Sequence, residues 1–200
     1  MKIEDYTPTP PADISCDSDG ENSTLHFERN LAHPPEAAWK ALTEARQLQK
    51  WTPYSIDRNI DTEGPALLTM NDGSEPPTYD INVTRVIPGK LVEYTWGESL
   101  LVWEVEATET GSKVTLHHTV PNPEWVTPAA AGWHMCFDLA ELMLNGVQWG
   151  DLAPIVGAAA MEYGWEKLAE HYLSVLGEKY GMQPPKEFDS ADSADSPESE

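Results

Sequence analysis

The sequence of 200 residues has few basic side chains. Only 12 Lys and Arg stand against 34 Asp and Glu, which gives a formal net charge of −22 at pH 7. A chain this acidic repels phosphate backbones and anionic lipids, so we expect neither nucleic acid nor a membrane surface as a partner. No run of 18 apolar residues occurs, so no membrane-spanning helix is expected. The N-terminus also lacks the apolar run of a secretory signal.

Cysteines and enzyme motifs are scarce as well. The two cysteines, Cys16 and Cys136, are interpreted as reduced thiols of a cytoplasmic protein. The sequence contains no Gly-x-Ser-x-Gly, no phosphate-binding loop, no dinucleotide fingerprint, no His-Glu-x-x-His and no paired Cys-x-x-Cys. His117 and His118 are adjacent on a predicted strand and point to opposite faces, so they cannot share one ion. We therefore expect no metal, no cofactor and no assignable catalytic residue.

What the chain does contain is enough apolar material for one core. Apolar residues make up 40% of it, including eight Trp and seven Tyr, which excludes a fully disordered chain. The last fifteen residues hold six acids and one Lys, and should stay disordered. We predict a flexible acidic arm over 1–23, one domain over 24–182 and a disordered acidic tail over 183–200. The tail either aids solubility or serves as a docking segment.

Residues 24–120 have the spacing of short strands. Alternation predicts a strand over 24–31, and the stretch 36–50 predicts two short helices with a joint near Thr43. Tight turns, among them 71–73 and 88–90, separate the strands that follow, so an antiparallel meander is expected. The predicted strands of this meander are 56–60, 66–70, 78–87, 91–96, 100–107 and 113–120.

The period changes after Pro128. The stretch 129–146 predicts a helix that is apolar over most of its circumference and therefore largely buried. Its polar residues form one narrow stripe, which we expect to face water, with His134 and Asp138 sharing a surface hydrogen bond. A second helix, which ends at Gly177, is predicted after a linker that contains Trp149 and Pro154. A curved sheet covered by one long helix makes the fold class α+β.

Four segments carry a resemblance to a known family. They read F-E-R-N-L-A-H-P-P-E-A-A-W-K-A-L-T at 27–43, V-I-P-G-K-L-V-E-Y-T-W at 86–96, T-E-T-G-S-K-V-T-L at 108–116 and G-W-H-M-C-F-D-L-A-E-L-M-L-N-G at 132–146. In this order they resemble the SRPBCC or START-like superfamily, and within it the branch similar to the C-terminal domain of the activator of the Hsp90 ATPase.

The resemblance implies a helix-grip fold. Its curved antiparallel sheet of about six or seven strands wraps a long helix, with two short helices after the first strand and an extra C-terminal helix. It also implies a cavity between helix and sheet, which in the superfamily holds lipids, hormones, polyketides or aromatic molecules and occasionally hosts catalysis. The chaperone-stimulating activity belongs to eukaryotic proteins with a separate N-terminal domain, for which this chain has no room.

Three polar residues lie in phase with the inward positions of their predicted strands: Arg29, Arg85 and His118. A buried guanidinium needs a partner, so these groups either hold an acidic ligand group or pair with carboxylates near a strand end. Cys136 either faces His118 as a nucleophile pair or is a buried and inert thiol. The predicted cavity residues, which packing alone also explains, are Trp51, Tyr79, Arg85, Trp96, Trp103, His118, Trp133 and Phe137.

Three functions remain open at this stage. The favoured one is a non-enzymatic protein that holds a hydrophobic or aromatic small molecule in an apolar cavity. The second is an enzyme of the cyclase, dehydratase or hydrolase kind, with His118 and Arg85 as its polar pair. The third is a protein-interaction module, chaperone-linked or homodimeric, with a solid core.

Overall fold

The strands form one curled antiparallel sheet. The computed structural model describes residues 6–71, 78–147 and 158–180. The strand order is β1-β2-β8-β7-β6-β5-β4-β3. The strands are β1 (Ile14–Ser18), β2 (Ser23–Leu31), β3 (Tyr54–Ile56), β4 (Gly64–Met70), β5 (Thr78–Ile87), β6 (Leu91–Trp96), β7 (Ser99–Thr108) and β8 (Gly111–Val120).

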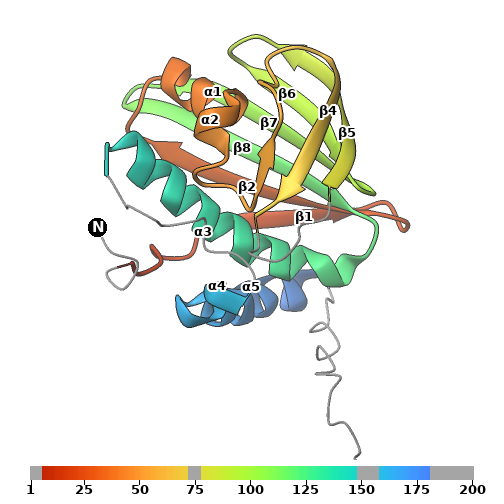
Figure 1. The fold of residues 1–200 in the computed structure, drawn as a ribbon. Helices are drawn as coiled ribbons and strands as arrows, with labels where there is room; N and C mark the ends of the chain where they lie inside the picture. The colour runs from red at the N-terminus through yellow and green to blue at the C-terminus, as the bar shows by residue number, and fades with distance from the viewer. Residues whose placement is uncertain (1–5, 72–77, 148–157, 181–200) are drawn as a thin grey trace, which may run out of the picture.

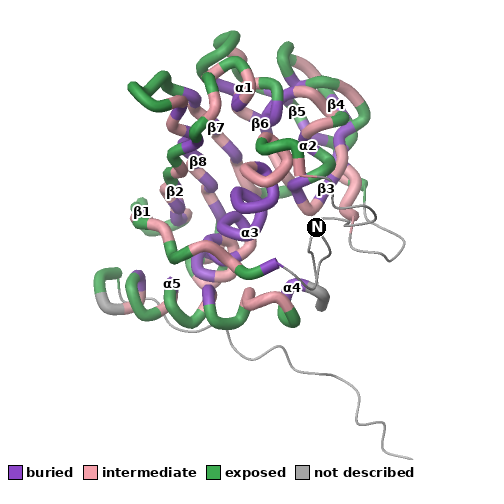
Figure 2. The backbone as a smooth tube through the Cα atoms, turned by 90° about the vertical axis from the view of Figure 1, so that its left-hand side faces the viewer, coloured by how far each residue is buried: buried purple, intermediate pink, exposed green. Residues whose placement is uncertain are grey.

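The longest helix, α3, lies across the inner face of this sheet. Figure 1 shows α3 between the sheet on one side and α4 with α5 on the other, and α3 contacts both β2 and α5. In the tube view of Figure 2, most of α3 is buried. Within the described residues, no helix combines the length and apolarity needed to cross a bilayer. The helices are α1 (Pro35–Thr43), α2 (Ala45–Leu48), the 3-10 helix η2 (Pro123–Trp125), α3 (Val126–Leu144), α4 (Ala158–Glu162) and α5 (Trp165–Tyr180).

Local sequence explains most of these elements. Pro34 is the N-cap of α1 and Pro35 its first residue, where a missing N–H has no consequence. The joint between the two short helices falls at Glu44, next to the predicted Thr43. In the turn between β5 and β6, Gly89 has a φ of +74°, which favours glycine. The predicted helix-grip arrangement is confirmed.

The sheet has one strand more than the upper prediction of seven. The prediction of a flexible arm over 1–23 is wrong for β1, whose five residues pair with β2 from Ile14 to Ser18. Cys16 is buried there, so an acidic segment is held by main-chain bonds to the sheet edge. The strand predicted over 56–60 shares only Ile56 with β3, and residues 57–60 are not in a strand.

The helix ends also differ from the predictions. The long helix begins three residues earlier than expected, at Val126. The extra helix is divided into α4 and α5, and α5 continues through Gly177 to Tyr180. Most of the predicted turn over 71–73 and the whole of the predicted tail over 183–200 lie outside the described residues.

Two glycines give a paired test of this packing. A Cβ at Gly111 would lie 2.1 Å from the carbonyl oxygen of Leu31, so we expect Gly111→Ala to lower the free energy of unfolding by about 1–3 kcal/mol. At Gly132 in α3 the nearest atom would be 4.0 Å away, so Gly132→Ala should raise it by about 0.5–1 kcal/mol. Urea unfolding measures both. Equal signs for the two variants would contradict the packing described here.

Candidate functional site

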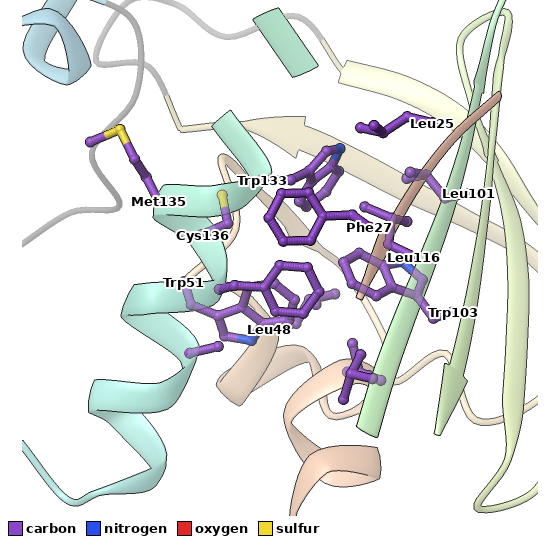
Figure 3. Close-up of a cluster of buried hydrophobic side chains, with 14 of the residues drawn as sticks. Leu25, Phe27, Leu48, Trp51, Leu101, Trp103, Leu116, Trp133, Met135 and Cys136 are labelled. Atoms are coloured by element: carbon purple, nitrogen blue, oxygen red, sulfur yellow. The ribbon is translucent and has the colours of Figure 1, made fainter. Parts of the chain in front are cut away.

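Aromatic rings fill the centre of the space between α3 and the sheet. The ring centroid of Trp103 on β7 lies 5.2 Å from that of Trp133 and 5.7 Å from that of Trp51. Phe137 stacks on Phe27 with centroids 5.1 Å apart. Figure 3 shows Trp133, Phe27 and Trp103 pointing toward one another from α3 and the strands. All five side chains are buried, so packed rings occupy this part of the interface.

A second group of rings surrounds His118 near the end of β8. Trp96 stacks on His118, with centroids 6.1 Å apart and 12° between the ring planes. The indole nitrogen of Trp133 donates to His118 Nδ1 at 3.0 Å. Tyr54 completes the group, with its ring centroid 5.1 Å from that of Trp96. We call these four residues, Tyr54, Trp96, His118 and Trp133, the His118 site.

The imidazole of His118 has an unusual environment for a polar group. Its Nε2 atom is buried and has no hydrogen-bond partner among the described residues. Burial lowers the pKa of His118 to about 4, so the ring is neutral at pH 7. The side chain therefore has one hydrogen-bonding atom without a partner, and aromatic rings surround it.

Two tyrosine hydroxyls lie beside this site. Tyr54 and Tyr94 share a hydrogen bond of 2.7 Å between their hydroxyl oxygens, and the indole nitrogen of Trp103 donates to the Tyr94 hydroxyl at 3.1 Å. Burial raises the pKa of Tyr94 to about 12, and it raises the pKa of Tyr54 as well. Both phenols stay protonated at neutral pH, so the surroundings of His118 carry no charge from them.

A separate polar cluster surrounds Asp138, where α3 meets the N-terminal segment and β2. Its Oδ1 accepts from the Arg29 guanidinium at 2.8 Å and from the Thr9 hydroxyl at 2.6 Å. Its Oδ2 accepts from the Tyr6 hydroxyl at 3.0 Å and from the Thr9 amide at 2.9 Å. Burial alone would raise the pKa of Asp138, but hydrogen bonds from His134 and Thr9 more than offset it, and the pKa is lowered.

The polar stripe predicted to face water is therefore covered at its centre. His134 and Asp138 are both buried, and their contact at 3.5 Å is an interior one. Both ring nitrogens of His134 have partners, because Nε2 lies 3.1 Å from the Thr9 carbonyl oxygen and Nδ1 lies 2.7 Å from the Tyr172 hydroxyl oxygen. The N-terminal segment and α5 supply these partners, which a pattern within one helix cannot reveal.

On the outer face of the sheet, two histidines form a cross-strand pair. The Nδ1 atoms of His26 and His117 are 2.6 Å apart. Their Nε2 atoms lie 3.0 Å from Asp17 and 3.6 Å from Glu104. Among the described residues, no three or more His, Cys, Asp or Glu side chains are grouped so that they could hold one metal ion.

The residues predicted to line a cavity do not all lie together in the structure. The structure brings Trp51, Trp103, Trp133 and Phe137 together in the central aromatic packing, and it places Trp96 and His118 beside them. Tyr79 on β5 is half-buried, and its ring lies 4.0 Å from the position a Cβ on Gly97 would take, next to Trp96.

The inward placement of Arg85 is wrong. A bulge between Val83 and Arg85 shifts the register of β5 against β6, and Arg85 is exposed. Arg29 does face inward, but its charge is paired with Asp138, so it needs no ligand anion. Neither guanidinium group is therefore available inside the protein to bind an acidic ligand, as the hypothesis of a cationic spot required.

The cysteines are free and buried. Burial raises the pKa of the Cys136 thiol to about 12, so the nucleophilic thiolate is not formed at neutral pH. Burial likewise raises the pKa of Cys16 to about 11. Neither thiol has the environment of a reactive cysteine.

A hollow of about 500 Å³ lies outside the helix–sheet interface. It is open to solvent and is formed where the N-terminal segment passes over α4 and α5. Its walls include Tyr6, Pro8 and Pro11 from the N-terminal segment, with Tyr163 and Lys167 from the helices. Its position differs from that of the predicted cavity beneath α3.

Sequence reasoning missed Tyr54 and Tyr94 as members of the site region. The phase of Tyr54 with Ile56 and that of Tyr94 with Val92 would have placed both inside. No such signal existed for Tyr6, Thr9 and Tyr172, because they reach Asp138 and His134 through chain separations of 38 to 132 residues.

Comparisons with solved structures identify the fold. A protein of unknown function, EF2215 from Enterococcus faecalis, is 16% identical with a TM-score of 0.61, covering 82% of this chain and 91% of its own. CalU16 from Micromonospora echinospora is 14% identical with a TM-score of 0.61, covering 82% and 98%. The AHSA1 protein SPO3351 from Silicibacter pomeroyi is 23% identical with a TM-score of 0.53, covering 62% and 99%. No curated protein sequence matches this chain significantly.

The family itself is identified by sequence. The sequence model described as "Activator of Hsp90 ATPase homolog 1-like protein" matches residues 32–143. This match covers more than half of the 200 residues and runs from the end of β2 into the last turn of α3. The chain therefore belongs to the family of activator of Hsp90 ATPase homolog 1-like proteins.

Proposed function

We propose that this protein binds a small hydrophobic or aromatic molecule at the His118 site. The observation that carries the proposal is the buried, unpartnered Nε2 atom of His118 inside a group of aromatic rings. A ligand site of this kind is mostly apolar and contains a few fixed polar atoms. The family fold, in which ligand binding is common, supports the same interpretation.

The route into the site would be through Trp96. Tyr54, Trp133 and His118 are buried, whereas Trp96 is half-buried at the end of β6. Gly97 follows it with a φ of +57°, so the indole stands next to a tight turn. Rotation of the Trp96 side chain would open the stacked face of His118 to a ligand ring.

Truncation of Trp96 tests this proposal. With 2-acetylnaphthalene as the probe, we expect saturable one-to-one binding by isothermal titration calorimetry. Trp96→Ala should weaken the binding at least fivefold, because an aromatic pair contributes about 0.5–1.5 kcal/mol beyond its buried area. Trp39→Ala, which truncates a half-buried indole on α1, is the matched control and should leave the affinity unchanged.

Two negative results together would contradict the proposed function. Suppose no naphthalene-sized probe binds, and native mass spectrometry of protein purified from its own host finds no small molecule. The proposed function would then be wrong. Equal losses in the two tryptophan variants would place the binding away from the His118 site.

The enzyme alternative has lost its polar pair. Arg85 is exposed on β5, whereas His118 is buried on β8, so the two side chains predicted to cooperate face different surroundings. The protein-interaction alternative keeps one observation in its favour, the close aromatic packing around Trp103. Failure of the binding experiment above would favour that alternative.

A further inference from the structure

We infer that the molecule bound at the His118 site is an uncharged aromatic compound with an acceptor oxygen, and that His118 selects it by donating its Nε2–H. The inference rests on the proposed function and adds to it the chemical class of the ligand. Ketones, aldehydes, esters and quinones fused to or carried by an aromatic ring belong to this class.

The position of the imidazole proton follows from the partner of the other nitrogen. An indole N–H can only donate, and that of Trp133 points at His118 Nδ1 from 3.0 Å. Nδ1 must therefore be the acceptor, and it carries no proton. A neutral imidazole has one proton, so it resides on Nε2. The unpartnered atom at the site is a hydrogen-bond donor.

The rings around this donor restrict what can meet it. Trp96 lies parallel to the imidazole, and Trp133 stands edge-on to it, with 83° between the ring planes. Neither side chain offers an acceptor to Nε2, since an indole nitrogen only donates. An acceptor brought by a ligand would satisfy the atom, and the aromatic body of the ligand would contact the indoles.

Charge restricts the ligand further. The imidazole is neutral, and the tyrosines beside it stay protonated. A carboxylate ligand would lose its hydration without gaining a counter-charge, and an ammonium ligand would present donors to a donor. A neutral carbonyl oxygen accepts the hydrogen bond and needs no counter-charge.

A matched pair of probes tests this donor. 2-Acetylnaphthalene and 2-isopropenylnaphthalene have nearly the same shape and differ in C=O against C=CH₂. The hydrocarbon is the more hydrophobic of the two, so burial alone would favour it. We expect the wild-type protein to bind the ketone at least tenfold more tightly, because a buried donor left unpaired discriminates strongly against the analogue that lacks the acceptor.

The variant His118→Phe provides the control for the donor. It keeps an aromatic ring at the site and removes the N–H, so the preference for the ketone should fall to below twofold. A wild-type measurement that needs no variant accompanies it. In ¹⁵N-histidine NMR spectra, the proton of His118 should be found on Nε2. Binding of the ketone should change the chemical shift of that proton, and binding of the hydrocarbon should not.

Each possible outcome gives a decision. Equal affinity of the wild-type protein for both probes overturns the inference and leaves the proposed function standing. Absence of binding by both probes, together with absence of a small molecule in native mass spectrometry of the protein from its own host, overturns the proposed function. A preference that survives in His118→Phe, or a proton found on Nδ1, shows that His118 is not the selecting donor.

Discussion

Replacement of Asp138 by Asn is expected to lower the free energy of unfolding by about 3–5 kcal/mol. The carboxylate is buried and accepts hydrogen bonds from Tyr6, Thr9 and Arg29. Asparagine has nearly the same size, but it leaves the half-buried Arg29 guanidinium without a counter-charge. Its amide NH₂ would also face donors. Urea unfolding at pH 7, followed by tryptophan fluorescence, gives the measurement.

The matched control is Glu141→Gln, which removes one negative charge from the same helix. Glu141 is half-buried, and its substitution should change the free energy of unfolding by less than about 0.5 kcal/mol. A loss below 1 kcal/mol in Asp138→Asn would mean that the cluster around Asp138 contributes little to stability.

The stability of the wild-type protein and that of Asp138→Asn should also respond differently to acid. The pKa of Asp138 is lowered from 3.8 in the folded state. The stability that this group contributes is therefore fully present above its unfolded pKa, and it is lost as the pH falls through the folded one. Between pH 5 and pH 3 the wild-type protein should lose stability more steeply than Asp138→Asn. Parallel curves would show that the carboxylate is not preferentially ionised in the folded state.

Truncation of Trp103 should have an effect of similar size. We expect Trp103→Ala to lower the free energy of unfolding by about 3–5 kcal/mol. The indole is fully buried among Trp51, Trp133 and Phe137, so its removal leaves a large cavity. It also removes the donor to the Tyr94 hydroxyl. Chemical denaturation at neutral pH measures the loss.

Trp125→Ala is the comparison for this variant. The same side chain is removed, but Trp125 on η2 is 51% exposed, so less buried area is lost and the effect should be smaller. If the two variants lose equal stability, the centre of the helix–sheet interface is more loosely packed than the ring contacts indicate.

Periodicity in the sequence was sufficient to predict the order of the elements. Alternation in residues 100–107 and 113–120 predicts two strands, which β7 and β8 confirm. The apolar circumference of 129–146 predicts a helix, which corresponds to α3. These signals are local, because each strand or helix must bury one face of its own.

The failures have a common physical origin in contacts between distant segments. The sequence pattern of a polar stripe on α3 is the same whether water or another part of the chain covers the stripe. The burial of His134 and Asp138 could therefore not be predicted. A bulge in β5 shifts every later side chain by one position, which put Arg85 on the wrong face. For the candidate site, the sequence indicated Trp96, His118 and Trp133, but not which ring nitrogen would lack a partner.

The cluster around Asp138 also shows that the stretch matched by the family model is shorter than the segment needed to fold on its own. The matched stretch 32–143 contains His134 and Asp138, whereas Tyr6, Thr9, Arg29 and Tyr172 all lie beyond its ends. A polypeptide trimmed to that stretch would present a bare carboxylate and an unsatisfied imidazole on its central helix. In this protein, the flanking segments are components of the core.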